Sequence, residues 1–187
     1  ILVRGVFMTY KKKICLEKSM ITSTSNQQMK NLMLLMKKAK ARNEQELFVV
    51  EGRKMFQEVP KEWLKQVYVS ESFFAENDKM LAGYTYEIVS DSVFKAVSDT
   101  QTPQGILCLV RKPQYRLEEL LKGADTHLLI LESIQDPGNL GTMLRTGEGA
   151  GISGVVMNHT TVDLFNPKTI RSTMGSVYRM PFVYVEH

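Results

Sequence analysis

Cysteine and long apolar runs are both scarce in this sequence. The two cysteines, Cys15 and Cys108, lie far apart and suit neither a disulfide framework nor a metal site. A reducing, cytoplasmic location is the simplest interpretation. No apolar run approaches the length of a membrane span, and the first apolar stretch precedes its lysines, the reverse of a secretory signal. We therefore expect no metal and no membrane partner.

Acidic residues are almost absent from the first part of the chain. Residues 1–42 hold 10 Lys and Arg against one Glu, a net charge of +9, whereas residues 43–187 hold 14 against 19, a net charge of −5. This asymmetry predicts a basic N-terminal face for a polyanion. A solvated tail is the simpler interpretation for residues 1–19. We expect residues 1–25 to be a tail, disordered or foreign to the folded protein.

Strands and helices alternate along the rest of the chain, which predicts an α/β fold with a parallel or mixed sheet. Short apolar runs predict strands at 46–52, 65–70, 85–90, 105–110, 126–133, 153–158 and 180–186. Helical spacing and cap residues predict helices at 25–42, 53–59, 72–82, 91–98, 138–151 and 166–175.

We place a first domain at 26–112, a linker at 113–125 and a second domain at 126–187. The linker assignment rests on its proline, its glycine and a short amphipathic turn. Its "LEELL" segment has an alternative interpretation, as the first helix of the second domain.

A glycine-rich stretch, "DPGNLGTMLRTGEGAG", follows the predicted strand of the second domain. In open α/β sheets ligands bind beyond the carboxyl ends of strands, where helix N-termini offer free N–H groups. Gly141 and Arg145 are four residues apart and share a helix face. Because helical side chains lean toward the N-terminus, Arg145 would lie over Gly141 and approach Asn139. A guanidinium and a carboxamide so placed would suit a phosphate or a ribose hydroxyl.

The same stretch has a purely structural interpretation. Its glycines would then only permit close packing of helix on sheet, and Arg145 would pair with Glu148. The stretch contains neither a G-x-G-x-x-G run nor a G-K-[ST] run, which argues against dinucleotide and P-loop sites.

A second polar cluster, "NPKTIRSTMGS", reads as a short, well-capped helix. Asn166 suits the N-cap, Pro167 suits the first helical position and Gly175 suits the stop. Arg171 lies in the middle of this helix, with Thr173 beside it.

The two clusters together resemble the SpoU (TrmH) family of RNA 2′-O-ribose methyltransferases, of the SPOUT superfamily. "DPGNLGTMLRTGEGAG" is similar to the family's first motif at Asn139, Gly141 and Arg145. "NPKTIRSTMGSVYRMP" is similar to the second, with Arg171 and Gly175 in place. The segments "KNLMLLMKKAKARNEQELFVVEG" and "SDTQTPQGILCLV" resemble the substrate-binding domain of longer members.

The resemblance implies a fold and a departure from it. We expect an N-terminal L30e-like α/β/α domain that binds RNA substrate, followed by an α/β-knot methyltransferase domain. The family's third motif forms the knot and most of the S-adenosylmethionine pocket, and no counterpart of it is seen in this sequence. We therefore expect the knot domain to be incomplete, in a gene fragment or in a member that has lost its cofactor site. On that expectation this chain alone is inactive.

The activity implied is S-adenosylmethionine-dependent methylation of a ribose 2′-hydroxyl in ribosomal or transfer RNA. Asn139 and Arg145 would be catalytic, with Arg145 gripping the 2′-oxygen or a neighbouring phosphate and not acting as a base. Gly141, Asn166, Thr173 and Gly175 would support the motifs. Structured RNA would be bound by a set of basic residues: Lys30, Lys37, Lys38, Lys40, Arg42 and Arg171.

Two further expectations follow from the family. The complete protein would be a cytoplasmic homodimer, with its active site near the interface.

The alternative function, from another class, is a non-catalytic RNA-binding protein with a vestigial methyltransferase domain. A generic α/β nucleotide-binding enzyme ranks below both, because it leaves the two motifs and the basic first helix unexplained.

Overall fold

The structure, a computed structural model, describes residues 20–186, so residues 1–19 of the expected tail lie outside the described residues. The rest of that segment is ordered. Ile21 is buried and forms a parallel bridge to Val89, and its backbone N–H donates to the carbonyl of Ile88 at 2.8 Å. The prediction of a tail as far as residue 25 is wrong here, because Ile21 gains both burial and hydrogen bonds at the free edge of a strand.

The first lobe alternates helices and strands as predicted. Its elements in chain order are α2 (Gln27–Lys37), α3 (Ala39–Gln45), β1 (Leu47–Glu51), α4 (Arg53–Glu58), β2 (Leu64–Ser70), α5 (Glu71–Asn77), η1 (Asp78–Leu81), β3 (Tyr86–Val89), α6 (Asp91–Val97) and β4 (Ile106–Arg111). Asn26 caps α2 by accepting a hydrogen bond from the backbone N–H of Gln28 at 2.8 Å. The single helix predicted over 25–42 is two helices, because Lys38 adopts extended geometry between them.

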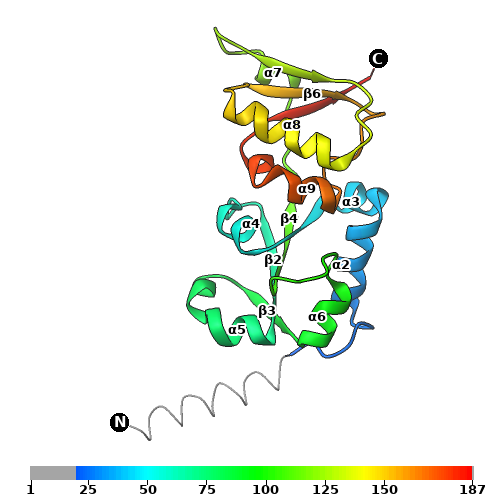
Figure 1. Cartoon of the computed structure of the whole chain (residues 1–187), viewed down its shortest axis with the longest axis vertical. Helices are drawn as coiled ribbons and strands as arrows, with labels where there is room; N and C mark the ends of the chain where they lie inside the picture. Colours follow the sequence, from blue (N-terminus) through cyan, green and yellow to red (C-terminus); the bar gives the residue numbers. More distant parts are fainter. Residues whose placement is uncertain (1–19, 187) are drawn as a thin grey trace, which may run out of the picture.

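The first sheet is mixed, with the strand order β1-β4-β2-β3. Strands β1 and β2 run antiparallel to β4, and β2 runs parallel to β3. Alternate residues face opposite sides: Phe48 and Val50 pack with α4 and α5, whereas Val49 packs with α2 and α6. Helices therefore cover both faces, which confirms the predicted three layers (Figure 1). Cys108 lies in β4, an inner strand of this sheet, where burial raises the pKa of its thiol.

The second lobe is a smaller sheet with helices mainly on one side. Its elements are α7 (Leu117–Leu120), β5 (Leu128–Leu131), α8 (Pro137–Gly149), β6 (Gly154–Asn158), α9 (Pro167–Thr173), η2 (Ser176–Tyr178) and β7 (Phe182–Val185). The strands are all parallel, in the order β5-β6-β7. Leu120 of α7 packs on Val156 and Val183, on the face opposite α8 and α9. The segment expected to be a linker thus contributes the first helix of this lobe, which was the alternative interpretation.

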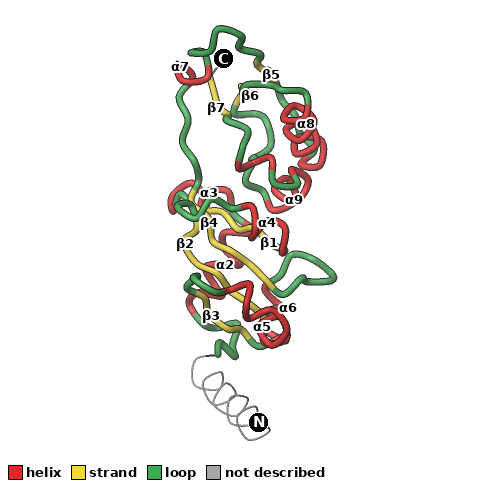
Figure 2. Tube along the Cα trace, turned by 90° about the vertical axis from the view of Figure 1, so that its left-hand side faces the viewer, coloured by secondary structure: helices red, strands yellow, loops and turns green. Residues whose placement is uncertain are grey.

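The two lobes share one hydrophobic core. Figure 1 shows α9 between α8 and the first lobe, and Figure 2 shows the connection from β4 to α7 running along one side of the molecule. The rings of Phe48 in β1 and Phe165 before α9 lie 4.7 Å apart. The Tyr178 hydroxyl donates to the carbonyl of Met55 at 3.1 Å, and burial raises the pKa of that hydroxyl. None of the helices in the described residues is long and apolar enough to cross a membrane.

Candidate functional site

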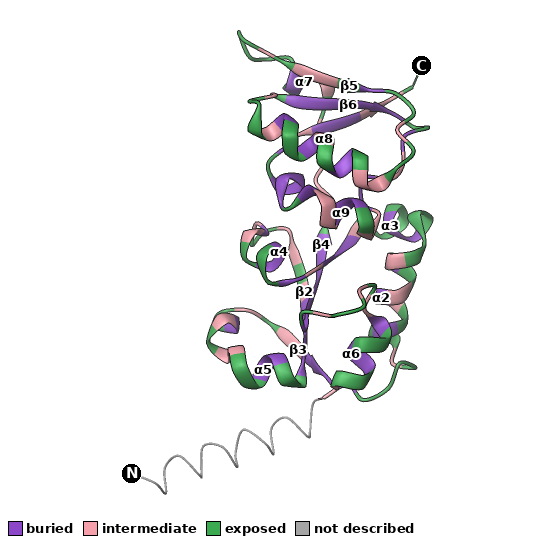
Figure 3. Cartoon of the chain, viewed as in Figure 1, coloured by how far each residue is buried: buried purple, intermediate pink, exposed green. Residues whose placement is uncertain are grey.

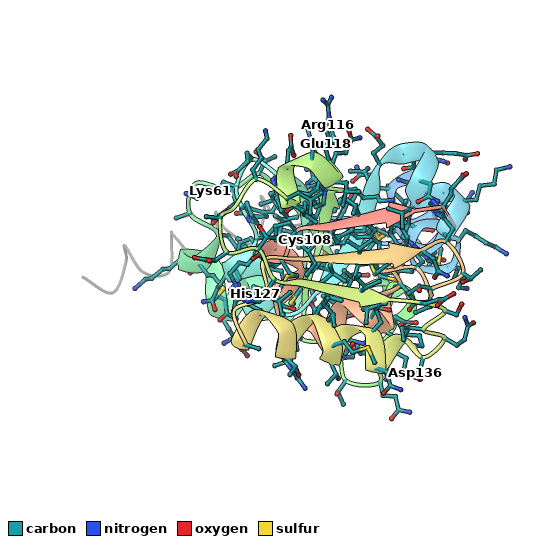
Figure 4. The ribbon with its side chains drawn as sticks, turned by 90° about the horizontal axis from the view of Figure 1, so that it is seen from above. Lys61, Cys108, Arg116, Glu118, His127 and Asp136 are labelled. Atoms are coloured by element: carbon teal, nitrogen blue, oxygen red, sulfur yellow. The ribbon has the colours of Figure 1, made fainter. Side chains whose placement is uncertain are left out.

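Helix α8, which carries the first motif, begins with a side-chain cap. The carboxylate of Asp136 accepts a hydrogen bond from the backbone N–H of Asn139 at 2.7 Å, and Pro137 occupies the first helical turn. This N–H lowers the pKa of Asp136, and Lys168 adds to the effect. The helix therefore starts at Pro137, one residue before the start predicted from the sequence. Asp136 lies at the outer end of α8, where the carboxyl ends of the strands emerge (Figure 4).

Gly141 is the point of closest approach between α8 and α9. A Cβ at this position would collide with the Ser172 hydroxyl and would lie 2.7 Å from the carbonyl oxygen of Thr169. Ser172 Oγ also donates to the carbonyl of Pro137 at 3.2 Å. The glycine thus permits helix-on-helix packing and not the helix-on-sheet packing considered above. Ser172 fills the space over Gly141, so the expectation that Arg145 would lie there is wrong.

Arg145 and Asn139 are both exposed on α8. The Arg145 guanidinium has no ion pair with any described residue. The alternative pairing with Glu148 does not form, because Glu148 accepts hydrogen bonds from the Arg179 guanidinium. Arg145 therefore presents its donors to solvent from a helix whose other side is fixed against α9.

Helix α9 has the caps that its sequence predicts. The Asn166 side chain accepts from the backbone N–H of Lys168 at 2.9 Å, and Pro167 starts the helix. Thr173 is fully buried and donates its hydroxyl hydrogen to the carbonyl of Ile170 at 2.7 Å. Gly175 adopts φ +97°, and a Cβ there would also collide with the Glu58 carboxylate of the first lobe. Thr173 and Gly175 are thus explained by packing.

Arg171 and Arg42, both predicted to bind RNA, form ion pairs across the lobe boundary. Arg171 Nη1 lies 3.0 Å from Asp99 Oδ2, with about a third of the arginine side chain exposed (34%). Arg42 is 3% exposed, and its Nη2 lies 2.6 Å from Asp163 Oδ2. Arg42 Nη1 also donates to the carbonyl of Leu35 at 2.6 Å. Because the Arg42 guanidinium is buried and paired with Asp163, it connects the two lobes and is not available to contact RNA.

The remaining predicted RNA contacts lie on the outer face of the first two helices. The exposed members are Lys30, Lys37, Lys38 and Lys40. Lys40 forms a long ion pair with Glu44 at 3.8 Å. The opposite face of α2 is buried on the sheet. These lysines are thus available to a ligand, although they lie on a different lobe from Arg145.

Three residues that matter for this arrangement were not picked out from the sequence. Asp163 and Asp99 each pair with an arginine more than 70 positions away along the chain, at separations of 121 and 72 residues. Ser172 interlocks with Gly141 across the helix pair. Local sequence patterns give no indication of partners this far apart along the chain. For Ser172 the available indication was a small residue directly beside Arg171 in the second motif.

Family models match both lobes. The MRM3-like substrate binding domain matches residues 26–108, and the SpoU rRNA Methylase family matches residues 126–187. Residues 126–187 are thus a SpoU methylase domain, preceded by an MRM3-like substrate-binding domain. The resemblance on which the expectations were built is thereby confirmed, together with the order of a substrate-binding domain before a methylase domain.

Relatives within the SpoU family are longer than this chain. The chain is 35% identical to the 23S rRNA (guanosine(2553)-2′-O)-methyltransferase RlmP of Bacillus subtilis, over 87% of this chain and 64% of that protein. It is 33% identical to the rRNA methyltransferase 3, mitochondrial, of Homo sapiens, over 84% of this chain and 40% of that protein.

Solved structures agree with this assignment. The AdoMet-bound rRNA methyltransferase from Sinorhizobium meliloti superposes with a TM-score of 0.76 and 26% identity, over 89% of this chain and 64% of that one. An RNA 2′-O ribose methyltransferase superposes with a TM-score of 0.72 and 30% identity, over 90% and 66%. The mixed α/β fold predicted for the two domains is confirmed.

Proposed function

We propose that the protein carrying this chain is an enzyme that methylates the ribose 2′-hydroxyl of ribosomal RNA, with S-adenosyl-L-methionine as the methyl donor. The observation that carries this proposal is Arg145, an exposed guanidinium without an ion pair among the described residues, on a helix locked against its neighbour. A surface arginine kept free of carboxylates is suited to an anionic ligand. The names of the relatives support ribosomal RNA as that ligand.

The chemistry asked of Arg145 is charge stabilisation. A ribose hydroxyl is a weak nucleophile, so its proton must be removed or its developing charge must be stabilised. A guanidinium, with a pKa above about 12, does not act as a base at neutral pH. Arg145 would therefore donate hydrogen bonds to the 2′-oxygen or the adjacent phosphate. Asn139, at the first turn of the same helix, would orient the ribose.

The described residues supply exposed groups for the RNA side of this reaction, Arg145 and Asn139. The loops after β5 and β6 are bonded to each other: Ser133 Oγ lies 2.7 Å from Thr160 Oγ1, and Gln135 Nε2 donates to the Thr160 carbonyl at 2.8 Å. None of four surface cavities in the described part of the chain is lined by Asn139 or Arg145. We assign no step of the reaction through the cofactor.

RNA contacts by the first lobe complete the proposal. The exposed lysines of α2 and α3 would contact phosphates, which gives affinity and little sequence choice, and this affinity would fall as salt rises. Structured RNA, recognised by its shape and its 2′-hydroxyls, suits such a surface. A homodimer and a cytoplasmic location belong to the same proposal. The buried, unpaired Cys108 supports a reducing compartment.

The decisive test is Arg145→Ala in the protein that carries this chain, with Thr146→Ala on the same exposed helix as the matched control. Transfer of radiolabelled methyl groups to ribosomal RNA is measured beside RNA affinity. We expect Arg145→Ala to lower the methylation rate by about 100-fold to 1,000-fold, as loss of an oxyanion donor does, with a much smaller loss of RNA affinity, since the lysines of the first lobe keep their phosphate contacts.

Each failure of this test has its own meaning. An unchanged methylation rate in Arg145→Ala would remove the catalytic role. RNA binding with no methylation by the wild-type protein would favour the alternative, a non-catalytic RNA-binding protein. Equal losses in both variants would point to damage to α8 as a whole.

A further inference from the structure

A cavity between the two lobes lies beside Arg171. Its volume is about 320 Å³, at the lower end of the range of small-ligand sites. It is lined by Glu51, Gly52, Lys54, Met55, Thr100, Thr102, Gln104, Arg171 and Met174. The first seven of these residues come from the end of β1, the first turn of α4 and the loop before β4, and the last two come from α9 and its C-cap. An RNA strand that runs from one lobe to the other at this boundary would pass the cavity.

The lining of this interlobe cavity combines two cationic side chains and apolar groups with one carboxylate, Glu51, whose oxygens accept hydrogen bonds from Ser98 and Thr100. Arg171 and Lys54 supply positive charge, and the Lys54 side chain is 60% exposed. Met174 ends α9 in a left-handed conformation and is 44% exposed, which is unusual for so large an apolar side chain. A nucleotide has the complementary parts, a phosphate for the cations and a flat, partly apolar nucleoside for the methionine.

Asp99 holds the Arg171 guanidinium through a single hydrogen bond of 3.0 Å. Both side chains are partly exposed, 34% for Arg171 and 50% for Asp99. An ion pair this exposed adds little to stability, so its partners exchange readily. A phosphate offers a guanidinium two parallel hydrogen bonds in place of one. The Asp99 carboxylate thus occupies a position that a phosphate would take with better geometry.

The loop on either side of Asp99 is anchored. Ser98 Oγ donates to the Glu51 carboxylate at 2.8 Å, and Thr100 Oγ1 donates to the same carboxylate at 2.7 Å. The backbone at Asp99 is therefore held in place, and its side chain is free to leave Arg171 without movement of the loop.

The other arginines at the lobe boundary cannot exchange their carboxylate partners in this way. Arg42 is buried and bonded to backbone carbonyls as well as to Asp163. Arg179 is shared by two carboxylates, Glu58 and Glu148, and their hydrogen bonds raise its pKa further. Among the cross-lobe arginines of the described residues, Arg171 is the one with a single, exposed partner.

We propose that the interlobe cavity binds one nucleotide of the substrate RNA, with its phosphate on Arg171, and that Asp99 holds Arg171 until the RNA displaces it. The inference rests on the proposed function, because it takes RNA as the ligand. It adds the path of the strand between the lobes and a residue, Asp99, that opposes binding.

The test is a double-mutant cycle on RNA affinity, measured with the 187-residue chain and a fluorescein-labelled RNA stem-loop by fluorescence anisotropy. Asp99→Asn should raise affinity about threefold, since a weak competing ion pair is removed. Arg171→Ala should lower it about tenfold and should reduce the slope of log affinity against log salt by roughly 0.7 to 0.9. The double variant should bind as weakly as Arg171→Ala, because Asp99 acts only through Arg171.

The matched control is Glu62→Gln, which removes the same charge from an exposed position of the first lobe. Equal gains from Glu62→Gln and Asp99→Asn would overturn the inference in favour of a general charge effect. A gain from Asp99→Asn that persists without Arg171 would overturn it too. Circular dichroism checks that each variant is folded.

The proposed function can fail separately. A wild-type chain that binds no RNA would remove RNA as the ligand of both the enzyme and the cavity. If the double-mutant cycle gives the expected affinities but the protein does not methylate RNA, the cavity proposal holds and only the proposed catalytic activity is overturned.

Discussion

The two sheets of this protein differ in how completely they are covered. Both faces of the first sheet are packed by helices, and its central strand β4 is buried from Ile106 to Val110. The second sheet is packed by α8 and α9 on one face and by the short α7 on the other. On that second face Ile130 of β5 is 75% exposed and Leu121 is 54% exposed. Figure 3 shows the contrast between the buried β4 and β6 and the exposed outer surface of α8.

The difference shows that the second lobe depends on the first. Phe165 and Tyr178 complete the core of the second lobe against Phe48 and Met55 of the first. Buried and charge-paired contacts at the boundary then fix the angle between the exposed lysines of α2 and α3 and Arg145. Changes at the boundary should thus harm the whole molecule, whereas changes on the open face should leave folding intact.

The largest effect is expected from Asp163→Ala. It leaves the Arg42 guanidinium buried without its carboxylate, which costs about 3–5 kcal/mol in the free energy of unfolding. Urea denaturation followed by circular dichroism measures this cost. Asp163→Asn keeps the oxygen that accepts from the Phe165 N–H at 2.9 Å and should lose less. A loss under about 1 kcal/mol in the alanine variant, as for an exposed pair, would contradict the boundary role.

A smaller loss is expected from Gly141→Ala. The added methyl group meets the Ser172 hydroxyl and the Thr169 backbone, and such overpacking costs about 1–3 kcal/mol. Thermal denaturation gives the measurement. Gly149→Ala is the control, since a Cβ at Gly149 meets nothing within 4 Å and alanine favours a helix. Equal stability of the two variants would show that α8 and α9 separate easily.

Tyr178→Phe should lower the free energy of unfolding by less than Gly141→Ala does. It removes a buried hydroxyl and leaves the Met55 carbonyl without that donor, a loss of about 1 kcal/mol. The ring contact with Trp63, at 6.3 Å between centroids, is retained. Urea denaturation compares the variant with wild type. A loss above 3 kcal/mol would mean that the ring also moves, and the boundary would then be less tolerant than its contacts indicate.

The smallest effect on folding is expected from Ile130→Thr. The side chain faces solvent on a strand, so the free energy of unfolding should change by no more than about 0.5 kcal/mol. We expect the wild-type chain to self-associate through this apolar face and the variant to do so less. Light scattering at several concentrations makes the comparison. A clean wild-type monomer would show that the open face is tolerated in solution.

Much of the fold was accessible from local patterns. Every strand in the two sheets falls within or beside a short apolar run, and the cap at Asn166 was predicted from residue type alone. The errors have local causes. Lys38 breaks the first helix in a stretch whose spacing stays helical, and α8 begins one residue earlier than predicted because the Asp136 side chain caps it.

The candidate site was less accessible. Sequence similarity indicated Asn139 and Arg145 as catalytic residues, a prediction that stays open, and the structure places both on the exposed side of α8. It also assigned Arg42 and Arg171 to RNA, although one is buried and the other is paired with Asp99. The sequence alone does not show whether a basic residue is exposed to solvent or is paired with a carboxylate on another lobe.

The sequence by itself determined the order of elements and the caps of α9, because periodicity and turn chemistry act over a few residues. Its two motifs indicated the family by resemblance. Tertiary structure alone decided what the arginines do. The partners of Arg42 and Arg171 lie 121 and 72 positions away, and their pairing depends on how two lobes meet. That meeting is set by the shape of a shared core, which no local pattern encodes.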